Sequence, residues 1–211
     1  SKHGPVLKDD NKAYALRFVG MNDANHSTAW LKMNKSKNID EWLDALRMEQ
    51  LASLNLVYAD KDDNIFFVHN AKSPVRDPNY NWKQVVPGNK SELIWTDFHP
   101  FESVPQILNP SSGYIFSTNQ NPFFVTAKED NLSLSNFNPT MGFQTRTTNR
   151  AYRAYELLDA DKSISFSELD KYKHDNKFSY NSRQYKFMEE IFNHEFSENK
   201  LKNAQKFLRD W

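Results

Sequence analysis

Two short apolar runs joined by a few polar residues constrain the fold of this chain more than any other feature. Leu54–Ala59 and Ile65–His69 are rich in β-branched and aromatic residues, and Lys61–Asn64 connects them. This pattern predicts a β-hairpin. Because apolar residues lie on both faces of the first run, we expect it to be covered on both sides, in the middle of a layered domain. Asn55 interrupts that run, and a buried amide without partners costs about 1–3 kcal/mol.

The composition excludes several classes of protein. A chain of 211 residues is long enough for one or two domains with a buried core. Its 27 basic residues balance its 27 acidic ones, which argues against a nucleic-acid partner. No apolar segment approaches the roughly 20 residues that span a bilayer, so no membrane partner is expected. The chain has no cysteine, which excludes disulfides, thiol catalysis and cysteine-type zinc sites.

Helical periodicity is clearest just before the hairpin and again near the end of the chain. Residues 39–49 carry apolar side chains at helical spacing, and Asn38 with Glu41 fits the pattern of a capped start. After Phe143 the pattern becomes mostly helical. Apolar stripes occur in 151–158, 185–192 and 201–211, and the expected caps are Ser165, paired with Glu168, and Ser197.

The remaining sequence predicts strands and long loops. His3–Val6 and Tyr14–Phe18 are typical of two short strands around a turn, and Gly113–Phe116 is expected to be another short strand. The segment 77–141, which contains Gly113–Phe116, is otherwise irregular and has seven prolines. We therefore predict an α+β chain with a β-rich part, 1–142, and a helical subdomain, 143–211.

Three local patterns suggest chemistry but have simpler explanations. Asp159–Ser163 resembles the start of a calcium-binding EF-hand loop, but Ile164 stands where glycine is needed and Lys171 where a bidentate glutamate is needed, so a helix-to-helix turn is favoured. The six histidines show no metal-ligand spacing. Ser1 could act as an N-terminal nucleophile, but the residues after it predict only an exposed turn.

Nine motifs follow one another in the order typical of one enzyme family, the penicillin acylases among the N-terminal nucleophile hydrolases. The chain resembles this family from its first residues to its last. The motifs are H-G-P-V at His3, Y-A-L-R at Tyr14, N-x-x-Y-A-D-x-x-x-N-I from Asn55, P-V-R at Pro74, V-P-G at Val86, P-F-E at Pro100, N-P-S-S-G-Y-I-F-S-T-N-Q-N-P from Asn109, T-N-R-A-Y-R-A-Y-E-L-L from Thr148, and the final L-R-D-W.

The resemblance implies a fold, a reaction and a set of partners. It implies part of an αββα sandwich, and an acylase that hydrolyses a small-molecule amide through an N-terminal serine. In the family this serine precedes the H-G-P-V motif by more than a hundred residues, so it is not Ser1. We therefore expect an internal piece of the β-chain, inactive and prone to self-association by itself, whose partners are the other segments of the precursor. A secreted or periplasmic location and no cofactor are expected, although a structural calcium in the full enzyme is possible.

The resemblance also assigns roles to particular residues. Asn55 matches the asparagine of the family's oxyanion hole, and Arg76 matches an arginine that orients the site. Asn119 matches a further polar position without a defined role. The residues alone favour a different interpretation of Asn55, as a core amide bonded to a neighbouring loop, and Arg76 could form a surface ion pair with Asp77.

Two questions of function stay open at this stage. The segments after Thr148 favour an acyl-homoserine lactone over a penicillin-type substrate. The alternative from another class is a non-catalytic binding module that uses its aromatic-rich loop, 82–114, to hold a partner or a sugar.

Overall fold

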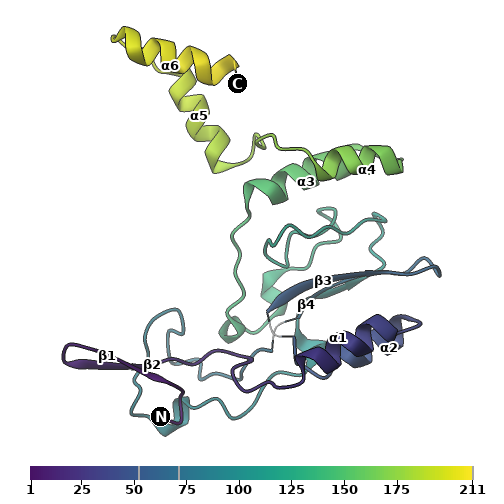
Figure 1. The fold of residues 1–211 in the computed structure, drawn as a ribbon, viewed down its shortest axis with the longest axis vertical. Coiled ribbons are helices and arrows are strands. Elements are labelled where there is room, and N and C mark those ends of the chain that lie inside the picture. Colours follow the sequence, from purple (N-terminus) through teal and green to yellow (C-terminus); the bar gives the residue numbers. More distant parts are fainter. Residues whose placement is uncertain (52, 71, 211) are drawn as a thin grey trace. The chain divides into compact units, whose positions relative to one another are not determined.

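The computed structural model describes residues 1–51, 53–70 and 72–210, and it shows an α+β fold (Figure 1). The chain divides into two compact units, Ser1–Arg146 and Thr147–Trp211. The described part of the first unit contains two antiparallel sheets, and that of the second contains helices. In the first unit, β1 (Val6–Asp9) and β2 (Lys12–Ala15) form a hairpin of their own, a few residues from the expected strand positions.

The predicted central hairpin is confirmed. β3 (Leu54–Ala59) pairs with β4 (Ile65–Asn70), and β5 (Gln106–Leu108) pairs with the other edge of β4, all antiparallel. The Asp60 carboxylate closes the turn because it accepts hydrogen bonds from the backbone N–H groups of Asp62 and Asn64, at 2.9 and 3.1 Å. This arrangement is an Asx-type turn, in which a side chain replaces a backbone acceptor.

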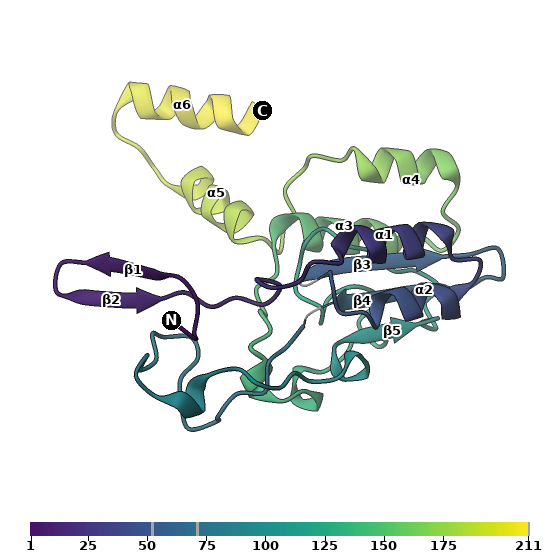
Figure 2. The same ribbon diagram turned by 60° about the horizontal axis from the view of Figure 1, so that its bottom comes forward.

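β4 is buried on both faces. Phe66 and Val68 face one hydrophobic cluster, together with Leu56 and Tyr58 from β3, and Phe67 faces a second cluster with Ile107 and Val125. Two helices cover the first cluster, α1 (His26–Lys35) and α2 (Ile39–Leu46). Figures 1 and 2 show both helices along the same side of the sheet.

The prediction that Leu54–Ala59 is covered on both faces is wrong for this chain. β3 is an edge strand of the sheet, and the side chain of Val57 is 54% exposed. The second face carries Asn55, Val57 and Phe67, and here irregular chain around Val125 packs against Phe67 without reaching Val57. The apolar run without alternation therefore marks a strand with one face only partly covered.

Helix starts follow the sequence closely where a side chain caps them. In α2 the Asn38 side chain accepts a hydrogen bond from the Glu41 backbone N–H at 2.9 Å, as predicted, although the helix ends at Leu46 rather than at residue 49. α1 has no side-chain cap and a weakly apolar face, which explains why the sequence pattern did not indicate it.

The predicted strand Gly113–Phe116 is not formed. Gly113 has a positive φ of 75° and lies in a turn, and the edge of β4 beside it is already occupied by β5. The described residues between β4 and the second unit contain four single 3₁₀ turns. Two precede β5, at Ser91–Leu93 and Phe101–Ser103, and two follow it, at Leu134–Asn136 and Pro139–Met141.

The second unit contains four helices in its described part, as the periodicity predicted. They are α3 (Asn149–Ala160), α4 (Phe166–Lys173), α5 (Arg183–Asn193) and α6 (Asn199–Asp210). Ser165 and Glu168 form the predicted capping box at the start of α4. The cap by Ser197 stays a prediction. Among the described residues, no helix is long and apolar enough to cross a membrane.

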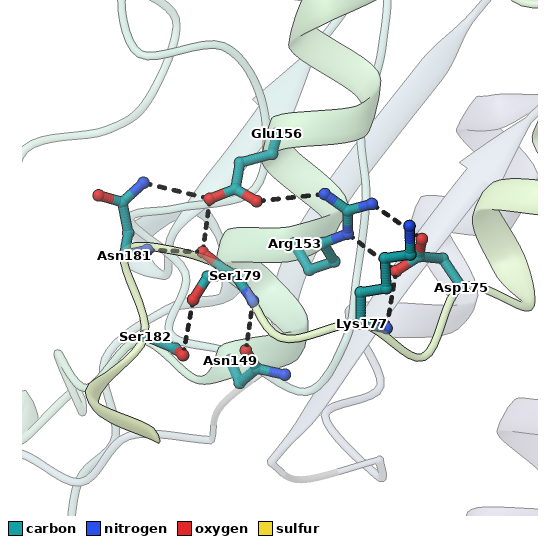
Figure 3. Close-up of polar contacts among 8 residues, drawn as sticks. All are labelled: Asn149, Arg153, Glu156, Asp175, Lys177, Ser179, Asn181 and Ser182. Atoms are coloured by element: carbon teal, nitrogen blue, oxygen red, sulfur yellow. Dashed lines mark hydrogen bonds and ion pairs between the residues drawn. The ribbon is translucent and has the colours of Figure 1, made fainter. Parts of the chain in front are cut away.

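A polar network ties the connection between α4 and α5 to α3 (Figure 3). Arg153 donates two hydrogen bonds to the Asp175 carboxylate, at 2.8 and 2.9 Å. Glu156 accepts from the hydroxyl of the fully buried Ser179 at 2.5 Å, and Asn149 accepts from the Ser179 backbone N–H at 2.8 Å. The Arg153 guanidinium holds the pKa of Asp175 below its usual value.

Loss of Phe67 is expected to destabilise the first unit strongly. The side chain is 0% exposed, and Phe→Ala at such a site typically costs about 3–5 kcal/mol. Val57→Ala, on the same face of the sheet, is the matched control and is expected to cost about 1 kcal/mol or less because Val57 is largely exposed. Urea unfolding of the chain and its two variants tests this, and equal losses would contradict the assignment of Phe67 to the core.

Arg153→Met is expected to weaken the second unit by about 1.5–3 kcal/mol, the usual range for hydrogen bonds to charged groups. Because the folded pKa of Asp175 is lowered, its contribution is present above the unfolded value, 3.8, and is lost as pH falls through the folded value. The difference from wild type should therefore shrink in acid. Hydrogen exchange of the α3 amides measures it, with Arg183→Met, an exposed arginine of α5, as the control.

Candidate functional site

Asn55 lies on the less covered face of β3, and both ends of its side chain are hydrogen-bonded. Its Nδ2 donates to the backbone carbonyl of Gln120 at 2.9 Å, and its Oδ1 lies 2.6 Å from Nδ1 of His69. His69 is the residue directly opposite Asn55 in the hairpin register. Since an amide oxygen only accepts hydrogen bonds, His69 Nδ1 carries the proton and donates it to Asn55.

His69 is held in a neutral, oriented state by its surroundings. Burial lowers the pKa of its imidazole, which favours the neutral ring with one protonated nitrogen. The ring meets Phe143 edge-on, with centroids 5.5 Å apart, and the His69 backbone N–H donates to the Pro105 carbonyl at 2.9 Å. His69 therefore orients the Asn55 amide.

The carbonyl that receives the Asn55 amide belongs to a tightly fixed loop. The Gln120 side chain is buried and donates to the carbonyls of Phe116 and Phe124, at 3.1 and 2.9 Å, while its own oxygen accepts from the Thr118 backbone N–H at 2.5 Å. Asn119, beside it, has a positive φ of 62°. The structure thus places the N-Q-N-P segment against Asn55, and Asn119 itself stays without an assigned role.

Arg76 lies in a separate aromatic environment. Its guanidinium carbon lies 4.8 Å from the ring centroid of Trp95 and 5.5 Å from that of Trp82. Its Nη1 donates to the Thr140 carbonyl at 3.3 Å, while its buried Nε has no hydrogen-bond partner within the described chain. Burial lowers the pKa of this arginine. A cavity of about 450 Å³ opens beside it, and Tyr80, Trp82 and Thr140 are among its lining residues.

The alternative explanation for Arg76, an ion pair with Asp77, is wrong within the described residues. The Asp77 carboxylate accepts hydrogen bonds from the backbone and the side chain of Asn79, both at 2.9 Å. The described contacts of the Asn55 amide are with His69 and Gln120, and Arg76 is not among them. An orienting role for Arg76 therefore stays a prediction. The guanidinium is a half-buried cation without a carboxylate partner in this part of the chain, a suitable neighbour for an anionic group.

The other candidate patterns occupy ordinary structural positions. Asp161 ends α3, accepts hydrogen bonds from the Ser163 backbone N–H and the Tyr172 hydroxyl, and raises the pKa of Tyr172 to about 12. The segment is a helix-to-helix turn, as expected. Ser1 lies in an exposed turn closed by Gly4. Within the described ranges no group of three or more acidic or histidine side chains is arranged to hold a metal, and the expectation about cofactors stays a prediction.

Sequence reasoning missed the two partners of Asn55, but not for the same reason. The register of a hairpin with a short connection places Asn55 opposite His69, so this contact could have been found. Gln120 is 65 residues away, and no local pattern indicates that its backbone carbonyl meets the amide.

Comparison with known proteins gives one consistent result. The family model for penicillin amidase matches residues 1–211. Penicillin G acylase of Escherichia coli is 34% identical over 124 residues, which is 57% of this chain and 14% of that protein. Penicillin acylase 2 proenzyme of Pseudomonas sp. strain SE83 is 30% identical over 123 residues, 56% of this chain and 16% of that protein. The aligned part thus spans a small share of these relatives.

A solved structure extends the likeness to the fold. Thermostable penicillin G acylase from Alcaligenes faecalis matches 99% of this chain and 37% of its own chain, with a TM-score of 0.69 and 24% identity. The α+β class predicted from the sequence is therefore confirmed, and the motif order, the family model and the fold agree. The chain belongs to the penicillin amidase family.

Proposed function

We propose that this chain supplies the oxyanion-binding asparagine of an amide-hydrolysing acylase. The nucleophile would be an N-terminal serine in another segment of the same protein. The observation that carries the proposal is the Asn55 side chain, clamped at both ends on a partly open strand face, in a chain that belongs to the penicillin amidase family.

The chemistry assigned to Asn55 follows from its hydrogen bonds. An amide nitrogen carries two N–H donors, and one of them is used by the Gln120 carbonyl. We assign the second to the substrate oxygen that becomes negative when the serine attacks the amide carbonyl. A fixed donor at this position stabilises the tetrahedral intermediate more than the bound substrate, so it acts on the turnover step. The acyl-enzyme that follows would be hydrolysed by water.

His69 has a positioning role in this proposal. Because His69 donates a hydrogen bond to Asn55 Oδ1, it fixes the orientation of the amide and keeps the Nδ2 donors on the opposite side. A neutral imidazole does this without placing a second positive charge in the site. Arg76 would add positive potential for an anionic part of the substrate, an expectation supported by its buried Nε, which has no hydrogen-bond partner among the described residues.

The substrate and the cellular location are also proposals. The names of the relatives support a penicillin-type amide, and the motifs after Thr148 support an acyl-homoserine lactone. Both contain the amide that the mechanism requires. Family membership supports a secreted or periplasmic enzyme assembled with other segments of its precursor.

A binding module remains the second candidate because of the cavity of about 450 Å³ beside Trp82. The aromatic lining of this cavity already makes contacts within the chain. Trp82 Nε1 donates a hydrogen bond to the Asp77 carbonyl at 2.7 Å, and the Trp82 ring packs on Arg76. Binding of a phenylacetyl amide with no turnover by the complete protein would favour this candidate over the acylase.

Asn55→Ala in the complete mature enzyme is expected to lower kcat by about 10²–10³-fold, equal to about 2.7–4 kcal/mol, with a much smaller change in KM. Steady-state hydrolysis of a chromogenic phenylacetyl amide and of acyl-homoserine lactones measures this. A gel for precursor cleavage accompanies the assay, because maturation passes through a similar oxyanion. Asn64→Ala, in the hairpin turn, is the control for general damage to β3 and β4. A processed Asn55→Ala enzyme with normal kcat would remove Asn55 from the mechanism.

His69 is expected to make the fold less stable as the pH falls below 6.5. Its folded pKa is lowered, so the unfolded chain takes up a proton that the folded chain refuses, and stability is lost between the unfolded value of 6.5 and the lower folded value. His69→Gln, which keeps an N–H donor, should remove this part of the pH dependence and retain more activity than His69→Ala. Urea unfolding at several pH values gives the first readout, and kcat gives the second. Identical pH profiles for wild type and His69→Gln would refute a neutral, buried His69.

A further inference from the structure

A large groove lies within the second unit, and Asn55, His69 and Arg76 are not among its described lining residues. Its volume is about 720 Å³, within the range of pockets that bind small molecules. Apolar side chains from α5, α6 and the connection before α5 form much of its lining, namely Phe178, Tyr185, Met188, Phe192 and Leu208. Tyr180 stands at the lining too, edge-on to Tyr185 with ring centroids 4.6 Å apart. The groove offers a ligand aromatic and aliphatic side chains beside polar ones.

The charged groups that line this groove all have one sign. They are Arg153, Lys177 and Arg209, and the lining residues in the described chain include no carboxylate. Arg153 is neutralised by Asp175 and Glu156. The Lys177 ammonium acts on Asp175 as a more distant charge, and within the described chain neither this ammonium nor the Arg209 guanidinium forms an ion pair. Arg209 donates to the Phe192 carbonyl and lies over the Phe192 ring, which leaves further N–H donors on the guanidinium.

The connection between α4 and α5, which contains Lys177, is ordered by hydrogen bonds in the absence of a ligand. Figure 3 shows Asp175, Lys177, Ser179 and Asn181 bonded to side chains of α3 or to one another. The Lys177 backbone N–H donates to Asp175 at 3.1 Å, and the Ser179 hydroxyl is held by Glu156. A connection of this kind would otherwise be free to move. Because its backbone is already ordered, binding would not have to supply the free energy of ordering it.

We propose that this groove binds an amphiphilic carboxylate, a molecule with one carboxylate on an aryl or medium-length acyl body. The apolar body lies against Tyr185, Met188 and Phe192, and the carboxylate meets Lys177 and Arg209. Aromatic and aliphatic walls select the body, and the two cations, with no acidic group among the described lining residues, select the charge. The site is independent of Asn55 and of the proposed acylase reaction.

The test is a titration of the full chain with sodium phenylacetate and with sodium octanoate, followed by amide shifts in two-dimensional NMR at constant ionic strength. Phenylacetamide, which has the same ring but no charge, is the matched ligand control. Saturable shifts confined to 176–192 and 204–210 are expected for the carboxylates, and phenylacetamide should bind at least about tenfold more weakly, since a charge-assisted hydrogen bond is lost.

Variants distinguish a specific binding site from nonspecific electrostatic attraction of the carboxylate to the chain. Lys177→Met and Arg209→Met should each weaken binding about tenfold or more, and Lys173→Met, an exposed lysine of α4 outside the lining, should leave it unchanged. Lys177→Met is the decisive variant, because its side chain is not part of the α5–α6 packing and its spectrum should stay that of the folded chain. Equal binding of phenylacetamide, equal loss in Lys173→Met, or the absence of saturable shifts would each overturn the proposal.

Discussion

Burial of β4 on both faces is the constraint on which the first unit depends. A strand with Phe66 and Val68 on one side and Phe67 on the other must be covered by two layers, and the chain supplies α1 and α2 for one side and irregular chain around Val125 for the other. Because side chains alternate along a strand, this choice also fixes the positions of its neighbours. Asn55 and His69 are placed on the same face as Phe67, where the covering layer is incomplete.

The pair formed by Asn55 and His69 shows how a strand can present a polar group without a charge. Each side chain satisfies part of the other's hydrogen-bonding capacity across the hairpin. A lysine or aspartate at either position would place an unpaired charge beside Phe143 and the buried Gln120. The neutral pair leaves one amide N–H fixed in direction, which is the property that a preorganised oxyanion donor needs.

Those parts of the structure that depend on neighbouring residues could be predicted, and those that depend on distant ones could not. The hairpin and the starts of α2 and α4 follow from local patterns, because Asn38 and Ser165 act within one helical turn. The sequence predicts a short strand at Gly113–Phe116, because an apolar run follows the glycine. The strand that pairs with the second edge of β4 is Gln106–Leu108, and which segment fills that edge depends on the assembled sheet. The surroundings of Arg76 bring together Trp82, Trp95 and Thr140, which lie 6 to 64 positions away in the sequence.

The irregular loops of this chain are held by amide and hydroxyl side chains rather than by backbone ladders. Asn131 accepts hydrogen bonds from the N–H groups of Val125 and Thr126 and donates to the carbonyls of Thr126 and Ala127. Gln120 does the same for the neighbouring loop. A buried loop must satisfy its backbone groups one by one, and asparagine and glutamine offer both a donor and an acceptor to do so. The abundant amide side chains thus have a structural use, and it brings the Gln120 carbonyl to Asn55.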